Sequence, residues 1–375
     1  MSLRIAADQY LQNVESLLPE GVELFQFDPA NGLPDDVTNY DALLIRTVIQ
    51  INSQTLPKTG NLKFIGTASA GFDHIDRNYL AKEGVHFSQS EGCNANAVGE
   101  YVVAVLYKWA EKMRITISDK TVGVVGCGHT GSAVINLLKK LDINYVAYDP
   151  PKEIRDQNFR SASVAELMEA DILTFHTPLT SSGDHPTKHL GNREWFDSGF
   201  DLIINASRGG VVNESDLFNQ FKKGTVGNYI LDVWENEPLF SDDIAKHAFL
   251  ATPHIAGYSV ESKFRATKIV LTRLLNSFGL EPNQNVKPKP FDPAHFTYSD
   301  TFSFTDFMWR NNQIYYYSTE LRKLIGLPSK KKSVAFADLR SKTSLRHEYS
   351  SMLKSKEVQG KAPHEFSIFN HSKPD

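Results

Sequence analysis

The sequence predicts two doubly wound parallel α/β domains, one Rossmann-type and one flavodoxin-like, followed by a small α+β domain at the C-terminus. Three observations lead to this fold class. Short apolar runs alternate with helical stretches in two successive parts of the chain. A glycine-rich turn joins a valine-rich strand to a helix where the second part begins. A stretch rich in proline and polar residues then separates a third part.

The first part, up to about residue 94, reads as a parallel sheet with helices on its faces. Four short apolar runs predict buried strands, at residues 3–8, 22–27, 42–47 and 63–69. Residues 9–18 between the first two runs have helical spacing. Residues 95–112 predict one long, largely buried helix that carries the chain into the second part.

The second part repeats the same alternation and predicts another doubly wound sheet. A strand, a turn and a helix occupy residues 120–149, and further strands are expected at 171–178, 201–207, 228–234 and 248–254. The helix predicted over 259–279 could return to the first part. We therefore expect a discontinuous substrate-binding domain (1–94 with 258–284), a nucleotide-binding domain (95–257) and a C-terminal dimerisation domain (285–375).

The third part begins after a linker at 280–293, which lacks any periodicity. Residues 306–326 have apolar side chains near helical spacing. The last fifteen residues have the composition of a poorly ordered tail, and the chain contains no internal repeat.

Composition limits the classes of function. A chain of 375 residues with net charge -4 gives no sign of a nucleic-acid surface or a polybasic membrane patch. Two cysteines, Cys93 and Cys127, make no disulfide framework and fit a reducing compartment. The N-terminus has no signal-peptide pattern, and the run at 101–107 is too short to span a bilayer. We expect a cytoplasmic protein.

The glycine-rich turn predicts a dinucleotide site. Gly126, Gly128 and Gly131 have the spacing that permits a tight turn, lets a pyrophosphate approach the backbone and packs the helix on the sheet. His129 and Thr130 open the helix, whose free N–H groups can hold phosphate. Asp149 ends the next strand, near the expected distance for an acid that binds ribose and repels a 2′-phosphate, which favours NAD over NADP. The alternative interpretation of Asp149 is a helix cap or a surface carboxylate.

Charged side chains follow three later strands. Arg208 comes after the strand at 201–207, Glu237 lies in the acidic segment after 228–234, and His254 closes the run at 248–254. The carboxyl ends of parallel strands meet at the edge where such folds bind ligands. An arginine there can grip a carboxylate, and a histidine beside an acid can move a proton. For His254 the alternative is a core or surface histidine, and for the acids a solvated loop carboxylate.

Four ordered motifs together resemble those of the NAD-dependent D-2-hydroxyacid dehydrogenases. They are GCGHTG, NASRGGVVNESDL, DVWENEP and PHIAG. The segments IRT, FIGTASAGFDHID and HIAGYS and the third part resemble those members that oxidise 4-phospho-D-erythronate to 2-oxo-3-hydroxy-4-phosphobutanoate for pyridoxal 5′-phosphate synthesis. The alternatives are a dehydrogenase of another 2-hydroxy acid, such as 3-phosphoglycerate or glycerate, and a dinucleotide-sensing binding protein on the same fold.

The resemblance implies a role for each matching residue. Arg208 would bind the substrate carboxylate, His254 would take the hydroxyl proton, and Glu237 would hold the imidazole. Substrate contacts would come from Thr47, Thr67 and Tyr258. Besides the glycine-rich turn, NAD contacts would come from Asp149, Thr177, Ala206, Ser207, Arg208, Asp232 and Gly257. We read Cys127 as a small buried residue and expect no metal site.

The substrate phosphate needs further cations, because the Arg208 guanidinium is committed to the carboxylate. Arg46 lies at the end of a predicted strand of the first part and is the first choice for the phosphate, with a locally paired surface arginine as the alternative. The third part supplies Arg340 and Arg346. Of these, we expect Arg346 to reach an active site, either that of its own chain or that of the partner subunit. We also expect the aromatic segment at 314–321 to join two subunits in a homodimer.

Overall fold

The computed structural model describes residues 2–341 and 345–369 and forms two compact units. One contains the residues up to Asn94 together with Ser259–Pro290, and the other contains Ala95–Tyr258 together with the residues from Phe291 onward. The C-terminal segment, which the sequence predicts as a domain of its own, therefore belongs to the same compact unit as the nucleotide-binding fold. Its buried aromatic side chains explain this, because they share a core with helix α3 (Ala95–Met113).

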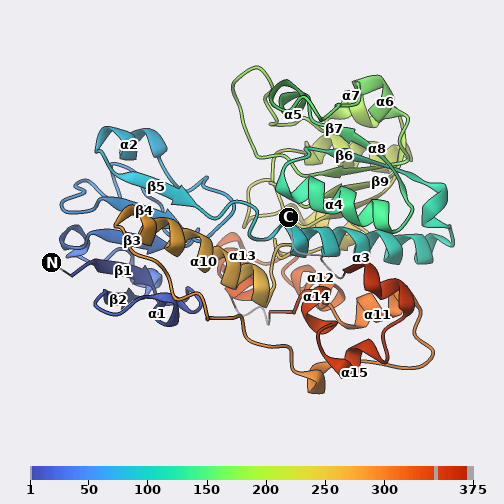
Figure 1. Cartoon of the computed structure of the whole chain (residues 1–375). Coiled ribbons are helices and arrows are strands. Elements are labelled where there is room, and N and C mark those ends of the chain that lie inside the picture. Colours follow the sequence, from blue (N-terminus) through green and yellow to red (C-terminus); the bar gives the residue numbers. More distant parts are fainter. Residues whose placement is uncertain (1, 342–344, 370–375) are drawn as a thin grey trace. The chain divides into compact units, whose positions relative to one another are not determined.

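The first unit is a five-stranded parallel sheet in the order β2-β1-β3-β4-β5, which is the flavodoxin-like order (Figure 1). The strands are β1 (Arg4–Asp8), β2 (Glu23–Phe27), β3 (Ala42–Ile45), β4 (Phe64–Thr67) and β5 (His86–Gln89). The helices are α1 (Val14–Leu17), α2 (Arg77–Lys82) and α10 (Val260–Ser277). The first four strands lie where the apolar runs predict them, whereas β5 is missed and α1 is much shorter than the pattern at 9–18.

Both faces of this sheet are covered. Leu44 and Phe64 pack on one face in a core that includes Leu271 of α10, while Ile45 and Ile65 lie in a second core on the other face. Strands buried on both faces read as continuous apolar runs, as β3 and β4 do.

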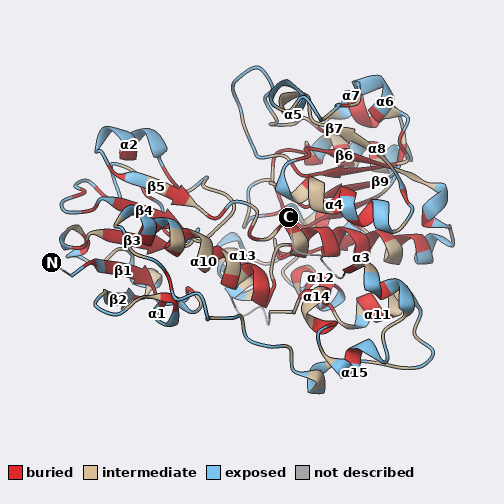
Figure 2. Cartoon of the chain, viewed as in Figure 1, coloured by how far each residue is buried: buried red, intermediate tan, exposed pale blue. Residues whose placement is uncertain are grey.

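The second unit holds a six-stranded parallel sheet in the order β11-β10-β9-β8-β6-β7. Its strands are β6 (Thr121–Val125), β7 (Asn144–Tyr148), β8 (Ile172–Phe175), β9 (Phe200–Asn205), β10 (Val226–Leu231) and β11 (Leu250–Ala251). The inner strands are almost wholly buried (Figure 2). The chain moves to opposite sides of β6 in β7 and β8, so the switch point where such sheets bind ligands lies there.

Seven helices among the described residues belong to the nucleotide-binding part of this unit. Besides α3 they are α4 (His129–Lys140), α5 (Pro150–Arg155), α6 (Val164–Met168), α7 (Arg193–Phe196), α8 (Glu214–Lys223) and α9 (Asp242–His247). Helices α3 and α4 pack side by side.

The C-terminal segment is helical, so the α+β prediction for it is wrong. It forms α11 (Phe304–Arg310), α12 (Ile314–Arg322), α13 (Ser329–Ser341), α14 (Tyr349–Met352) and α15 (Lys356–Gln359), and no strand occurs in its described residues. The tail prediction is also wrong up to residue 369, because Phe366 and Phe369 are fully buried beside Tyr349. Residues 370–375 of that predicted tail lie outside the described part of the chain.

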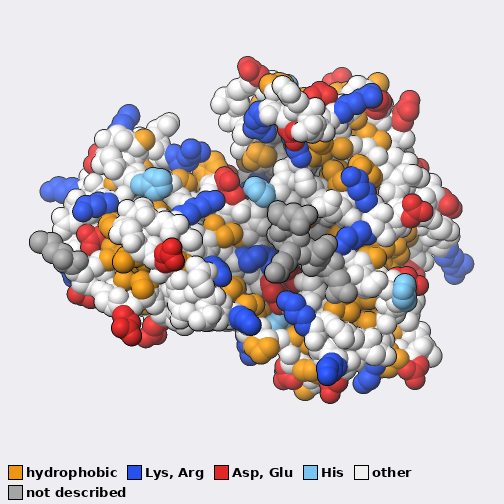
Figure 3. Space-filling view, in the orientation of Figure 1, with side chains coloured by type: hydrophobic (Ala, Val, Ile, Leu, Met, Phe, Trp, Pro, Cys, Tyr) orange, Lys and Arg blue, Asp and Glu red, His pale blue; other side chains and the backbone are white. Residues whose placement is uncertain are grey.

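The surface is of mixed charge. On the face drawn in Figure 3, basic and acidic side chains are interspersed, in keeping with the small net charge of -4. Within the described ranges, no helix is long and apolar enough to cross a membrane.

Candidate active site

The glycine-rich turn after β6 is shaped by steric limits. Gly126 has φ +87°, and a Cβ there would lie 2.7 Å from Thr177 Cγ2. A Cβ on Gly131 would collide with the Gly126 carbonyl oxygen, so helix α4 lies directly on the turn. Gly128 differs, because nothing lies within 4 Å of its Cβ position. The open side of the turn is therefore at Gly128, at the N-terminus of α4, where a pyrophosphate would approach.

Asp149 is tied to this turn. Its Oδ2 accepts a hydrogen bond of 2.8 Å from the Cys127 N–H, and its Oδ1 accepts one of 2.9 Å from the Lys152 N–H. The second bond caps helix α5. The helix-capping alternative is thus true, but the cap places the carboxylate beside the glycine-rich turn, where the ribose acid of this fold is expected.

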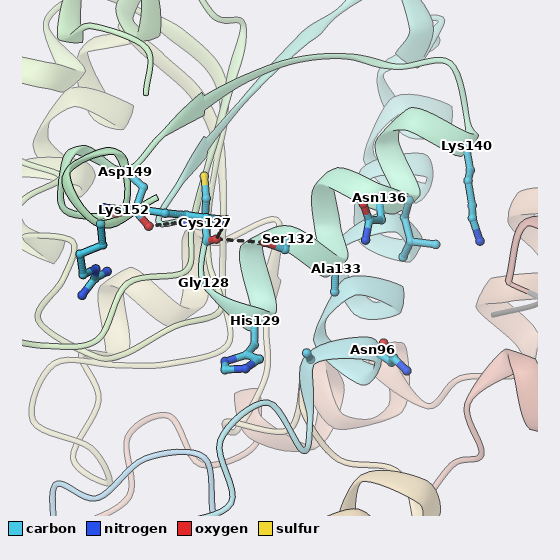
Figure 4. A pocket seen from close by; sticks show the side chains of 13 residues that line it. Asn96, Cys127, Gly128, His129, Ser132, Ala133, Asn136, Lys140, Asp149 and Lys152 are labelled. Carbon is cyan, nitrogen blue, oxygen red and sulfur yellow. Dashed lines mark hydrogen bonds between the residues drawn. The ribbon is translucent and has the colours of Figure 1, made fainter. Parts of the chain in front are cut away.

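A pocket of about 550 Å³ opens beside the turn (Figure 4). It is lined by the turn, by the first residues of α3, by one side of α4 and by Asp149 with its neighbours. Lys152 donates to the Cys127 carbonyl at 2.9 Å, and Lys140 and Arg155 add further positive charge to the lining. Burial, with Asp149 adding to it, raises the pKa of the Cys127 thiol to about 12, so this side chain is an inert packing residue.

Thr177 follows β8 and carries a hydroxyl that lacks a partner. Its Oγ1 is buried and makes no hydrogen bond within the described residues. The neighbouring His176 is buried, contacts Thr174 Oγ1 at 2.9 Å through Nε2, and is held neutral because burial lowers its pKa to about 3. A buried hydroxyl without a partner is costly unless a ligand satisfies it, so Thr177 fits a dinucleotide held at the turn.

Arg208 follows β9 on a loop that Asn205 holds in place. Asn205 accepts from the Ser207 N–H and hydroxyl and donates to the Arg208 carbonyl at 3.0 Å. Ala206 and Ser207 are both buried. A Cβ on Gly209 would collide with the Trp234 carbonyl, so this loop lies directly against the segment that carries Glu237.

Asp232, at the end of β10, fixes the backbone around His254. Its carboxylate accepts from the Ile255 and Ala256 N–H groups at 2.8 and 2.9 Å and from the Thr252 hydroxyl at 2.6 Å. Its carbonyl accepts from the His254 N–H at 2.6 Å. His254 adopts φ +58° inside this clamp. The sequence predicts Asp232 as a cofactor contact, and the structure adds a clamping role.

Glu237 and His254 form the pair that the motifs predict. His254 Nδ1 lies 3.0 Å from Oε1 and 3.1 Å from Oε2 of Glu237, so both carboxylate oxygens face the same ring nitrogen. Nε2 makes no hydrogen bond to any described residue. Burial raises the pKa of Glu237, but His254 and Arg340 outweigh it and hold the pKa below its ordinary value. An ionised carboxylate on one nitrogen leaves the other nitrogen for a substrate proton.

The same segment supplies the acid of a second acid–histidine pair. Glu235 Oε1 is 2.6 Å from Nε2 of His189, so Glu235 is not the partner of His254. The Glu235 N–H donates to Glu214 Oε1 at 2.6 Å. Burial, aided by the charges of Glu235 and Glu237, raises the pKa of Glu214 to about 8. In the sequence, only the motif around His254 distinguishes the two pairs.

The two C-terminal arginines lie in different surroundings. Arg346, predicted to reach an active site, is instead in a core: Nη1 lies 2.5 Å from Glu100 Oε2 and Nη2 donates to the Ala97 carbonyl at 2.8 Å. This ion pair joins the C-terminal segment to α3. Arg340 contacts Glu237 Oε1 at 3.3 Å and the Tyr258 hydroxyl at 3.2 Å. The arginine beside the predicted site is thus Arg340.

The predicted substrate residues of the first unit gather at the carboxyl edge of its sheet. Arg46 Nε lies 2.7 Å from Oδ2 of the fully buried Asp8, and Thr47 beside it is exposed. Thr67 is buried at the end of β4, with its hydroxyl 2.9 Å from His74 Nε2 and 3.0 Å from Ser69 Oγ. Of the three, Arg46 and Thr47 present polar groups at the surface of the unit.

Comparison with known proteins agrees with the motifs. Residues 98–256 match the family model of the D-isomer specific 2-hydroxyacid dehydrogenase NAD binding domain. Erythronate-4-phosphate dehydrogenase of Marinobacter nauticus is 38% identical over 281 residues, 74% of this chain and 73% of that protein. The enzyme of the same name from Legionella pneumophila is 38% identical over 293 residues, covering 77% and 82%.

Solved structures share the fold. The NAD+-bound 3-phosphoglycerate dehydrogenase of Entamoeba histolytica aligns with a TM-score of 0.62 at 22% identity, over 78% of this chain and 99% of that one. An NADPH-dependent glyoxylate/hydroxypyruvate reductase of Sinorhizobium meliloti aligns with a TM-score of 0.59 at 18% identity, over 78% and 100%. At these identities the likeness concerns the fold alone.

Proposed function

The chain belongs to the erythronate-4-phosphate dehydrogenase family of D-isomer specific 2-hydroxyacid dehydrogenases, and on that premise we propose that it oxidises 4-phospho-D-erythronate to 2-oxo-3-hydroxy-4-phosphobutanoate. It is an NAD-dependent oxidoreductase. The proposed reaction supplies an intermediate for pyridoxal 5′-phosphate. The observation that carries the proposal is the Glu237–His254 pair beside the Arg208 loop.

We propose the following division of labour. Arg208 binds the substrate carboxylate in a fork and orients the carbon that bears the hydroxyl. His254 takes the hydroxyl proton through Nε2, and Glu237 stabilises the imidazolium that forms. The glycine-rich turn, Asp149 and Thr177 would hold NAD, which would supply the hydride acceptor for the same carbon. One hydroxyl proton and one hydride leave the substrate, which gives the 2-oxo acid, NADH and a proton.

Arg46 and Thr47 are proposed to meet the phosphorylated end of the substrate, with Thr67 behind them. Arg46 brings a guanidinium that Asp8 orients, and phosphate recognition favours such pre-oriented cations. Tyr258 is proposed as a substrate contact from the second unit.

The homodimer and the cytoplasmic location are also proposals. Tyr315 and Tyr316 on α12 are 66% and 56% exposed, and neighbouring aromatic residues of this kind suit burial between subunits. Both cysteines are buried and neither forms a disulfide, in keeping with a reducing compartment. Light scattering of the purified protein tests the dimer.

NADH formation, followed by absorbance with a panel of 2-hydroxy acids, tests the reaction. We expect 4-phospho-D-erythronate to give the highest kcat/KM, above 3-phosphoglycerate, glycerate and unphosphorylated erythronate. A higher kcat/KM for another compound of the panel would identify that compound as the substrate in place of 4-phospho-D-erythronate. NADH binding without turnover of any of them would favour a dinucleotide-sensing role.

A further inference from the structure

We infer that Arg340 is a positioning residue of the proton-transfer site, which holds the Glu237 carboxylate beside His254 while it also contacts the Tyr258 hydroxyl. The inference rests on the proposed function and names a residue beyond the motifs that carry it. Glu237 Oε1 is shared: His254 Nδ1 lies 3.0 Å away and Arg340 Nη1 lies 3.3 Å away. The other guanidinium nitrogen, Nη2, donates to the Tyr258 hydroxyl at 3.2 Å.

Helix α13 is held in place by the segment that follows Glu237. Lys332, Phe336 and Arg340 are spaced by four residues and so share one face of the helix. The Lys332 ammonium donates to the Phe240 carbonyl at 2.8 Å and pairs with Asp242. The rings of Phe336 and Phe240 lie 6.0 Å apart, with Phe336 only 1% exposed. This face therefore docks onto residues 240–242 and delivers Arg340 to Glu237.

The guanidinium is partly buried and incompletely paired. Its side chain is 27% exposed, and Glu237 is 19% exposed. Arg340 Nε is buried and makes no hydrogen bond within the described part of the chain. A buried N–H donor of this kind usually has a hydrogen-bond partner in a folded protein. The two terminal nitrogens of Arg340, by contrast, contact Glu237 and Tyr258.

Several charges act on the pair besides Arg340. Glu235 and Glu214 lie near Glu237, with His189 paired to Glu235, and Asp232 acts on Arg340 from the end of β10. Arg340, on α13, contacts Glu237 and brings a positive charge that opposes the negative charges of these acids. The charge of Arg340 keeps the Glu237 carboxylate ionised. It also reduces the electrostatic stabilisation that this carboxylate gives to the His254 imidazolium. Removing the cation should therefore make His254 harder to deprotonate.

The direction of the expected pH shift follows from the oxidation reaction, because His254 must be neutral before it can accept the hydroxyl proton. In Arg340→Gln the low-pH limb of kcat/KM should move to higher pH by about 0.5 to 1 unit, with kcat about tenfold lower near neutral pH, while NADH affinity stays unchanged. Arg340→Lys keeps the charge and should keep the limb near its wild-type place. Lys331→Gln, which removes an exposed cation from the same helix, is the matched control and should match wild type.

A second readout needs no substrate. The imidazole resonances of His254, identified by their loss in His254→Asn, should titrate at higher pH in Arg340→Gln than in wild type. This keeps the two proposals separable, because the titration can shift even if no panel compound is turned over. Loss of thermal stability with an unmoved limb and unmoved resonances would make Arg340 a structural tether. A raised KM with an unmoved limb would make it a substrate contact. Either result overturns the inference.

Discussion

Two glutamates that lie two residues apart on the segment after β10 each contact a histidine, and only one of these pairs has the features of a proton-transfer site. Glu237 meets Nδ1 of His254 with both oxygens, at 3.0 and 3.1 Å. Glu235 meets Nε2 of His189 at 2.6 Å. Both histidines have positive φ, 58° and 55°, and their side chains are similarly exposed, 32% and 39%. An acid beside a histidine is therefore not what distinguishes a catalytic pair.

The difference lies in the surroundings. Asp232 clamps the His254 backbone through three N–H or hydroxyl donors, and Arg340 holds Glu237 from another helix. The His189 pair sits on a loop whose N–H at residue 189 donates to the Gly210 carbonyl at 2.7 Å. We interpret the His189 pair as a strut that fixes the Arg208 loop, while the His254 pair carries the proton.

The largest effect expected from this comparison is on the histidines. His254→Asn should retain NADH binding and lose turnover by a factor of about 100 or more, because the general base is gone. His189→Asn should keep turnover within about threefold, since a partly exposed pair contributes little. Steady-state NADH formation and NADH fluorescence titration measure both. Equal losses in the two variants would break the comparison.

The acids should differ by less. Glu237→Gln should lower kcat about tenfold and move the low-pH limb of kcat/KM to lower pH, because the imidazolium loses its stabilising charge. This is opposite in sign to the shift expected for Arg340→Gln. Glu235→Gln should leave the limb in place. A limb that moves in Glu235→Gln and stays in Glu237→Gln would assign the pairs the other way round.

The smallest effect concerns Glu214, a buried residue that accepts a hydrogen bond from the Glu235 N–H. Its pKa is raised by burial from 4.5 to about 8, so the folded state retains a proton that the unfolded chain releases. The stability it contributes is present below pH 4.5 and falls as the pH rises toward 8. Because glutamine does not ionise, Glu214→Gln should not lose this stability as the pH rises.

Urea unfolding at two pH values tests that sign. Glu214→Gln should match wild type near pH 5 and be more stable by roughly 2 kcal/mol near pH 8, with activity nearly unchanged. A variant less stable than wild type at both pH values would show that the carboxylate is ionised in the fold and needed there.

The sequence predicted the strands that carry an apolar run. Strands β3 and β4 are continuous apolar runs and were found, whereas β5, with the sequence HFSQ, is a partly exposed edge strand without an apolar pattern. The run at 306–326 forms two helices rather than one, because Asn312 is buried and its Oδ1 accepts from the Ile314 N–H at the start of α12. Short-range periodicity does not show such a break.

The site divides in the same way. Asp149, Arg208, Glu237 and His254 each follow a strand inside a recognisable motif, so their placement could be predicted. Arg340 and Arg346 lie on a segment without a motif, and their partners, Glu237 and Glu100, are far away in the sequence. The spacing of Lys332, Phe336 and Arg340 was visible, but the sequence does not say what that face covers.

The most direct test of the central claim is a pH titration of the wild-type histidines set beside the pH dependence of kcat/KM for 4-phospho-D-erythronate. Because kcat/KM reports the free enzyme, its low-pH limb should have the same midpoint as the NMR titration of the His254 imidazole. The limb should be absent from the residual activity of His254→Asn and unchanged in His189→Asn. A limb that persists in His254→Asn, or that follows the titration of His189, would contradict the assignment of His254 as the proton acceptor.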